Sequence, residues 1–156
     1  MKNTSLTGLE WQILELLQSD GRITISDLAI QLNRSRSSIS EHIKKMQDAG
    51  VLTGFSVQVA EEKLGVGISA FVRLQTGSLN HRKIISSLEQ IPEVAECHVL
   101  TGSDLVMMRV VARDMPHLRE IVDGFTEWGS TTTDVIFSTL KQHVSIGPAL
   151  RKAISR

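Results

Sequence analysis

Apolar residues recur at helical spacing near the start of the chain. Leu9, Ile13, Leu16 and Leu17 fall at i, i+4, i+7 and i+8, which is the pattern of one buried face on an amphipathic helix. Thr7 precedes this stripe, and Glu10 follows three residues later, so the pair has the spacing of a capping box. The pattern predicts a first helix that begins after Thr7.

Two further helical patterns follow before Gly50. The second predicted helix begins near Ile25, is capped by Thr24 or Ser26, and buries Leu28, Ala29 and Leu32. The third begins after Ser35, whose hydroxyl can accept a backbone N–H bond, and it buries Ile39, Ile43 and Met46. A short helix, a tight turn at Asn33 and Arg34, and another helix make up a helix-turn-helix layout.

After Gly50 the period of the pattern changes from helical to alternating. Residues 51–60 place Val51, Phe55, Val57 and Val59 on one side, which predicts a strand. The glycine-punctuated segment at 61–67 predicts a connection between domains. We therefore expect a helix-turn-helix domain with a hinge strand at 1–60, a second domain at 61–145 and a C-terminal extension at 146–156.

The second domain alternates strand and helix patterns. Strands are expected at 68–76, 93–101, 105–113 and 131–141, and helices at 80–91 and 114–128, with Asn80 and Asp114 as their caps. The order β-α-β-β-α-β predicts a ferredoxin-like α+β domain, in which two helices cover one face of an antiparallel sheet. The other face would carry Phe71, Val99, Met107, Met108 and Phe137, and we expect another subunit to bury it.

Composition limits the classes of function. The 156 residues are 41% hydrophobic, and 17 basic side chains balance 17 acidic ones, so a polyanionic partner would have to be attracted by a local patch. Cys97 is the only cysteine, which excludes an intramolecular disulfide framework. No apolar run approaches the roughly 20 residues that span a bilayer, and the first residues turn polar too early for a secretory signal. We expect a cytoplasmic protein without a membrane anchor.

A local patch of positive charge lies on the third predicted helix. Residues 34–45 contain four basic side chains and one acidic one, for a net charge of +3. The helical period places these side chains and several serines opposite the buried stripe. Because Arg and Lys bind phosphates and bases while Ser reaches base edges, this face predicts contact with the major groove of double-stranded DNA. The predicted DNA-binding residues are Arg34, Ser35, Arg36, Ser37, Ser38, Ser40, Glu41, Lys44 and Lys45.

Four segments of the chain resemble one family of transcription regulators. They are ILELLQSDGRITISDLA, RSRSSISEHIKKMQDAGVLTGF, EVAECHVLTGSDLVMMRVVARDM and TTTDVIFSTLK. In this order and spacing the chain resembles the leucine-responsive/asparagine-regulator (Lrp/AsnC, feast/famine) family over nearly its whole length. The resemblance implies a winged helix-turn-helix joined to a ferredoxin-like regulatory (RAM) domain. It also implies homodimers formed through the sheets, often assembled into octamers.

The resemblance further implies an amino-acid effector near the loop between the second and third strands of the regulatory domain. In this chain Asp104 stands where the family usually has an aromatic residue, and Leu105 replaces its usual aspartate. An amino acid needs an acidic partner for its ammonium and N–H or O–H donors for its carboxylate. The candidate effector-binding residues are Gly102, Ser103, Asp104, Leu105, Thr131 and Thr133. Three alternatives remain. Asp104 binds the ammonium from a shifted loop, the ligand is of another kind, or there is no ligand.

Other chemistry has weaker support in the sequence. Cys97 and His98 are adjacent on a predicted strand, so they point to opposite faces and do not share a metal. No nucleophile with a nearby base, phosphate-binding loop or paired carboxylates is recognisable, so we expect no catalytic residues, no metal and no cofactor. An effector-independent architectural DNA-binding protein is the main alternative, and an enzyme on the ferredoxin-like domain is a remote one.

Overall fold

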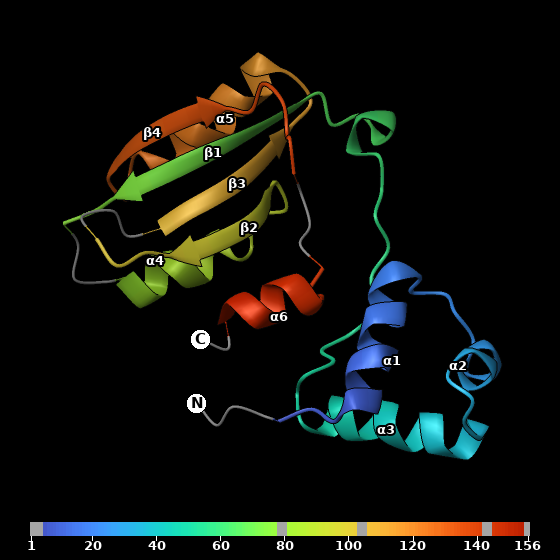
Figure 1. Cartoon of the computed structure of the whole chain (residues 1–156). Helices are drawn as coiled ribbons and strands as arrows, with labels where there is room; N and C mark the ends of the chain where they lie inside the picture. The colour runs from blue at the N-terminus through green and yellow to red at the C-terminus, as the bar shows by residue number, and fades with distance from the viewer. Residues whose placement is uncertain (1–4, 78–80, 103–105, 142–144, 155–156) are drawn as a thin grey trace. The chain divides into compact units, whose positions relative to one another are not determined.

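The computed structural model describes residues 5–77, 81–102, 106–141 and 145–154. The chain divides into two compact units. The first contains the helices α1 (Gly8–Ser19), α2 (Ile25–Gln31), α3 (Arg36–Asp48) and α6 (Pro148–Ile154) (Figure 1). The second comprises Val59–Leu140 and contains the β-sheet. Asn80 and the loop residues 103–105, which carry several of the predictions, lie outside the described residues.

The three helices predicted before Gly50 are confirmed. Thr7 caps α1, and Glu10 completes the predicted capping box, because each residue's side chain bonds the other's backbone N–H. Thr24, rather than Ser26, caps α2, and Ser35 caps α3. Their inward faces form one core, whose buried members are Ile13, Leu17, Leu28, Ala29, Ile39 and Met46.

The prediction of a strand at residues 51–60 is wrong for this chain. Residues 53–60 have no regular secondary structure, and the side chains of Phe55, Val57 and Val59 are more than half exposed. Val51 and Leu52, next to the end of α3, pack partly against the helical core. An alternating pattern becomes a strand only when a second strand supplies hydrogen-bond partners, and the described part of the chain supplies none for this segment.

The second unit is the ferredoxin-like domain that the element order predicted. Its strands are β1 (Ile68–Gln75), β2 (Val94–Val99), β3 (Val106–Ala112) and β4 (Ser130–Val135). They form an antiparallel sheet in the order β2-β3-β1-β4. Helices α4 (His81–Leu88) and α5 (Met115–Phe125) lie on one face of this sheet (Figure 1). A short 3₁₀ helix, η1 (Glu61–Leu64), precedes β1.

Strand register decides which apolar side chains the helices cover. Val72 pairs with Met108, and both are fully buried under α4 and α5 with Leu88, Leu118 and Phe125. The prediction that Met108 and Val99 belong to the uncovered face is therefore wrong. Met107 takes that face by alternation, and Val99 pairs with Val106, which lies on the helix side. The last strand ends at Val135, so Phe137 lies beyond the sheet and is fully exposed.

The uncovered face carries charged and apolar groups together. Arg109 donates to Glu61 through Nη1 and Nη2 at 3.1 and 3.2 Å, and to Glu96 through Nε at 2.8 Å. Bonds to Glu61, and then to Glu96, raise the pKa of Arg109 above its ordinary value. Phe71 lies opposite Arg109 in the sheet and is partly exposed beside this cluster.

Gly129 makes a close approach that only glycine permits. Its φ is 156°, and an added Cβ would lie well inside van der Waals contact with the carbonyl oxygen of Gln75. We expect Gly129→Ala to lower the free energy of unfolding by about 2–4 kcal/mol, because backbone atoms on both sides must shift. Urea unfolding of the full chain measures the loss.

A glycine of helix α5 in the same unit provides the control for this experiment. An added Cβ on Gly124 of α5 would meet nothing within 4 Å. Since alanine is the better helix former, Gly124→Ala should leave stability unchanged or raise it by about 0.5–1 kcal/mol. Equal behaviour of the two variants would contradict the close approach at Gly129.

Candidate nucleic-acid interface and ligand loop

The turn between α2 and α3 fixes where the third helix begins. Asn33 adopts a left-handed conformation with φ of 51°, which asparagine tolerates better than most residues. The Arg34 N–H then donates to the carbonyl of Ala29 at 2.9 Å. The Ser35 hydroxyl accepts from the N–H of Ser38 at 3.2 Å and so caps α3. These bonds satisfy the backbone groups that the two helix ends expose.

All nine predicted DNA-binding residues lie on α3 or on the turn before it. Eight are exposed and Ser38 is partly buried; the exposed ones are Arg34, Ser35, Arg36, Ser37, Ser40, Glu41, Lys44 and Lys45. The structure therefore places hydroxyls and positive charges on a single accessible surface opposite Ile39 and Met46. This is the arrangement that a recognition helix requires.

A buried carboxylate connects this helix to α1. The Glu10 side chain is only 1% exposed, and its Oε2 accepts from the Thr7 N–H at 2.7 Å. Its other oxygen, Oε1, lies 3.1 Å from Nδ1 of His42 and 3.0 Å from Nζ of Lys45. Glu10 thus caps α1 and holds two side chains of α3.

These contacts keep Glu10 charged despite its burial. The Thr7 N–H lowers the pKa of Glu10 most, and burial raises it. Lys45 and His42 lower it further, so that the pKa is about 2, compared with an ordinary value of 4.5. A carboxylate in this setting is stable because several donors replace the lost water.

The Glu10 cluster separates the two lysines of the predicted DNA surface. Lys44 is exposed. Among the described residues, its side chain forms neither a hydrogen bond nor an ion pair. Lys45 is also exposed, but its ammonium already pairs with Glu10. Part of the positive charge that Lys45 could offer a phosphate is therefore offset within the protein.

Sequence reasoning identified Glu10 as a cap and missed its second role. It also omitted His42 from any site. The available signal was that His42 and Lys45 stand three residues apart and share one side of α3. The spacing in the sequence could not show that α1 packs so as to bring a carboxylate to that side.

The predicted ligand loop is described only in part. Gly102, three residues beyond the end of β2, is exposed, whereas Ser103, Asp104 and Leu105 lie outside the described residues. Thr131 and Thr133 lie on β4 and pair with Leu74 and Val72. The register places Gly102 and Thr131 at the same end of the sheet, with β3 and β1 separating β2 from β4.

The single cysteine lies on the helix side of the sheet. Cys97 pairs with Met108, while His98 pairs with Met107 on the other face, so the two side chains point apart as predicted. Burial raises the pKa of the Cys97 thiol, which disfavours the reactive thiolate. Among the described residues, no group of three or more His, Cys, Asp or Glu side chains is placed to hold a metal ion.

The two units match two models of known protein domains. Residues 6–53 match a winged helix-turn-helix DNA-binding domain, and residues 69–146 match the Lrp/AsnC ligand binding domain. The first match covers α1–α3, and the second covers the sheet with α4 and α5. Together they define a transcriptional regulator that has a DNA-binding domain and a ligand-binding domain.

Comparison with known proteins gives the family. The chain is 34% identical over 141 residues to the transcriptional regulator AzlB of Bacillus subtilis, covering 86% of this chain and 90% of AzlB. It is 28% identical over 152 residues to the regulatory protein AsnC of Escherichia coli K12, covering 97% of each. The chain belongs to the Lrp/AsnC family of transcriptional regulators.

Solved structures show the same fold. E. coli AsnC superposes with a TM-score of 0.82 at 25% identity, covering 90% of this chain and 98% of that one. The regulator NMB0573 of Neisseria meningitidis, solved as a complex with L-Met, has a TM-score of 0.83 at 23% identity, covering 94% and 99%. Within the residues described here, no helix is long and apolar enough to cross a membrane.

The Glu10 cluster predicts a specific dependence of stability on pH. Because the pKa of Glu10 falls from 4.5 to about 2 on folding, its contribution is complete above pH 4.5 and is lost as the pH falls toward 2. The size is about 3 kcal/mol at most. We expect Glu10→Gln to destabilise the first unit at pH 7 and to remove this part of the pH dependence.

The measurement follows Trp11, which lies in α1, by fluorescence during urea unfolding at pH 3 and pH 7. A Trp128→Phe background removes the signal of the second unit. Glu15→Gln, in the same helix, is the control and should keep the pH dependence. If Glu10→Gln and the parent lose equal stability between pH 7 and pH 3, Glu10 does not stay charged by the contacts described.

Proposed function

We propose that this regulator binds specific double-stranded DNA sequences as a homodimer or higher oligomer and that an amino acid modulates the binding. The observation that carries the DNA part is the exposed polar face of α3, which is capped by Ser35 and anchored to α1 by Glu10. Such a target implies action where the DNA is, which is the cytoplasm of a bacterial or archaeal cell.

The side chains of α3 suit a division of tasks in the major groove. Arg36, Ser37 and Ser40 lie in its first half, and in helix-turn-helix proteins the N-terminal residues of this helix reach the base edges. Lys44 lies about two turns beyond Arg36 and about one turn beyond Ser40, where a flexible ammonium suits a phosphate. We assign sequence preference to the first group and general affinity to Lys44.

A homodimer is supported by two exposed apolar regions of the chain. Phe71 and Met107 lie on the sheet face that α4 and α5 leave uncovered. Phe55, Val57 and Val59 lie on a segment with alternating pattern and no partner strand among the described residues. A second copy can cover the first region and supply a strand to the second, and it also provides a second DNA half-site.

The effector part of the proposal rests on the ligand-binding domain. The Lrp/AsnC ligand binding domain model matches residues 69–146, and a neighbour with this fold was solved with L-Met. In this chain we assign the effector ammonium to Asp104 and the effector carboxylate to the backbone at Gly102 and nearby hydroxyls. Leu105, in place of the usual aspartate, makes Asp104 the only acid of that loop.

An effector-independent architectural protein is the second proposal to be tested. It would share the whole of the α3 surface and differ only at the loop between β2 and β3. An enzyme is disfavoured, since the relatives compared here are transcriptional regulators.

Salt dependence of DNA binding tests the role of α3. Lys44→Ala should lower the slope of log K against log salt by about one unit, since each phosphate contact contributes about 0.9. Lys45→Ala should lower it less, because that ammonium is already paired with Glu10. Fluorescence anisotropy, with DNA selected from a random pool by the unmodified protein, gives the slopes.

Thermal unfolding of each lysine variant serves as the control, since Lys45→Ala also removes a partner of the buried Glu10. The triple variant Arg36→Ala, Ser37→Ala, Lys44→Ala should lose both affinity and sequence preference. Unchanged affinity in this folded triple variant would leave α3 as a solvated surface helix without a role in DNA binding.

Thermal stabilisation across the amino acids tests the effector. A ligand that binds only the folded state raises the apparent stability by mass action. We expect selective stabilisation by at least one amino acid, loss of that effect in Asp104→Ala, and unchanged DNA binding of Asp104→Ala without effector. Asp123→Ala, an exposed acid on α5, is the matched control and should respond like the parent. A uniformly negative panel would favour the architectural protein.

A further inference from the structure

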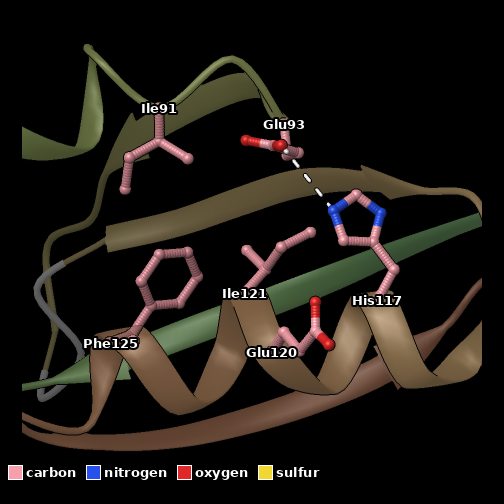
Figure 2. A pocket seen from close by; sticks show the side chains of 7 residues that line it. Ile91, Glu93, His117, Glu120, Ile121 and Phe125 are labelled. Carbon is pink, nitrogen blue, oxygen red and sulfur yellow. Dashed lines mark ion pairs between the residues drawn. The ribbon is translucent and has the colours of Figure 1, made fainter.

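A cavity lies on the helix side of the second unit, between α5 and the turn that leads into β2 (Figure 2). Its volume of about 310 Å³ falls at the lower end of the range of small-molecule sites. Ile91 lines one side, and Ile121 and Phe125 of α5 line the other. These three side chains point toward one another and form an apolar floor (Figure 2).

A glycine opens this cavity above the helix. Gly124 is part of the lining, and an added Cβ there would meet nothing within 4 Å. In an α-helix a longer side chain at this position would lie back over residues 120 and 121. The position therefore offers a way to fill the cavity without disturbing the core beneath it.

The polar part of the lining is acidic. It consists of Glu93, Glu120 and His117, and none of the described lining residues is Lys or Arg. Nδ1 of His117 accepts from the Arg113 N–H at 3.3 Å, so the ring proton of the neutral imidazole is on Nε2. Nε2 lies 3.7 Å from Oε1 of Glu93 (dashed line in Figure 2), which is within ion-pair distance for a protonated ring but too long for a hydrogen bond, so the Glu93 oxygens can still accept from a ligand.

Glu120 adds a second carboxylate at the rim. It is exposed on α5, and the ion pairs of the described residues do not include it. Two carboxylates beside a single imidazole, with no Lys or Arg in the described lining, favour a cation over a carboxylate. The apolar floor beside them favours a ligand that carries a hydrocarbon chain on its charged end.

We propose that this cavity is a binding site for a small organic amine, that is, a primary ammonium with a short branched or linear hydrocarbon chain. The ammonium bonds Glu93 and Glu120, and the chain packs on Ile91, Ile121 and Phe125. The site is distinct from the predicted effector loop, which joins the far end of β2 to β3, and it does not depend on the proposed response to an amino acid.

Calorimetric titration of the full chain with isoamylamine tests the proposal. We expect a dissociation constant of ~1 mM or tighter, within what six non-hydrogen atoms can supply. Glu93→Gln and Glu120→Gln should each weaken binding roughly tenfold, as expected for the loss of a charge-assisted hydrogen bond. Gly124→Leu should abolish binding, because the leucine side chain fills the cavity.

Matched controls separate this site from general attraction to an acidic surface. Glu127→Gln removes an exposed carboxylate just beyond α5, outside the cavity, and should bind isoamylamine like the parent. Isoamyl alcohol and 4-methylpentanoate should bind at least tenfold more weakly than the amine. Thermal unfolding confirms that Gly124→Leu, which replaces a helical glycine with a better helix former, is folded.

Three results would overturn the proposal. They are the absence of heat with isoamylamine at 10-fold above ~1 mM, equal binding of the amine and the alcohol, and unimpaired binding by Gly124→Leu. If Gly124→Leu instead changes the oligomeric state of the chain and not amine binding, the cavity is a contact between copies and not an amine site.

Discussion

The carboxylate of Glu10 is buried in the helical unit, whereas most acidic side chains of proteins are exposed. Burial of a charge is unfavourable unless hydrogen bonds and opposite charges replace the lost water. Here one oxygen receives the N–H at the start of α1, and the other is shared by His42 and Lys45 on α3. Because the same group satisfies a helix end and joins two helices, the direction of α3 relative to α1 is fixed by polar geometry as well as by apolar packing.

A similar division organises the second unit, where strand alternation sends each side chain to one of two faces. The face under α4 and α5 is filled by Val72, Met108 and Val110 and by the inward side chains of both helices. The opposite face has Arg109 at its centre, bonded to carboxylates from η1 and β2. Phe71 and Met107 lie on the same face as this charged cluster. A surface of this composition is suited to a partner that covers the apolar groups while Arg109 keeps its bonds to the two carboxylates.

Much of the fold could be predicted because it depends on local patterns. The spacing of Ile39, Ile43 and Met46 is sufficient to define the inner side of α3, and Ser35 is sufficient to define its start. The strand at 51–60 could not be predicted correctly, since alternation reports which side chains share a face and not whether a partner strand exists. Met108 was misplaced for a related reason: in an apolar run such as "LVMMRVVA", the register, and not hydrophobicity, decides the face.

The candidate sites divide along the same line. The nine residues of the α3 surface follow from helical periodicity alone, whereas the pairing of Lys45 with Glu10 and the cavity beside Gly124 arise from contacts between separate elements.

That distinction also bears on regulation. Residues 53–60 join the two units without regular secondary structure in the described chain. A ligand in the second unit can change DNA affinity only if it favours one arrangement of the DNA-binding units over another. Because Glu10 joins α3 to α1 within one unit, we expect such a response to act through the arrangement of whole units and not through the shape of α3.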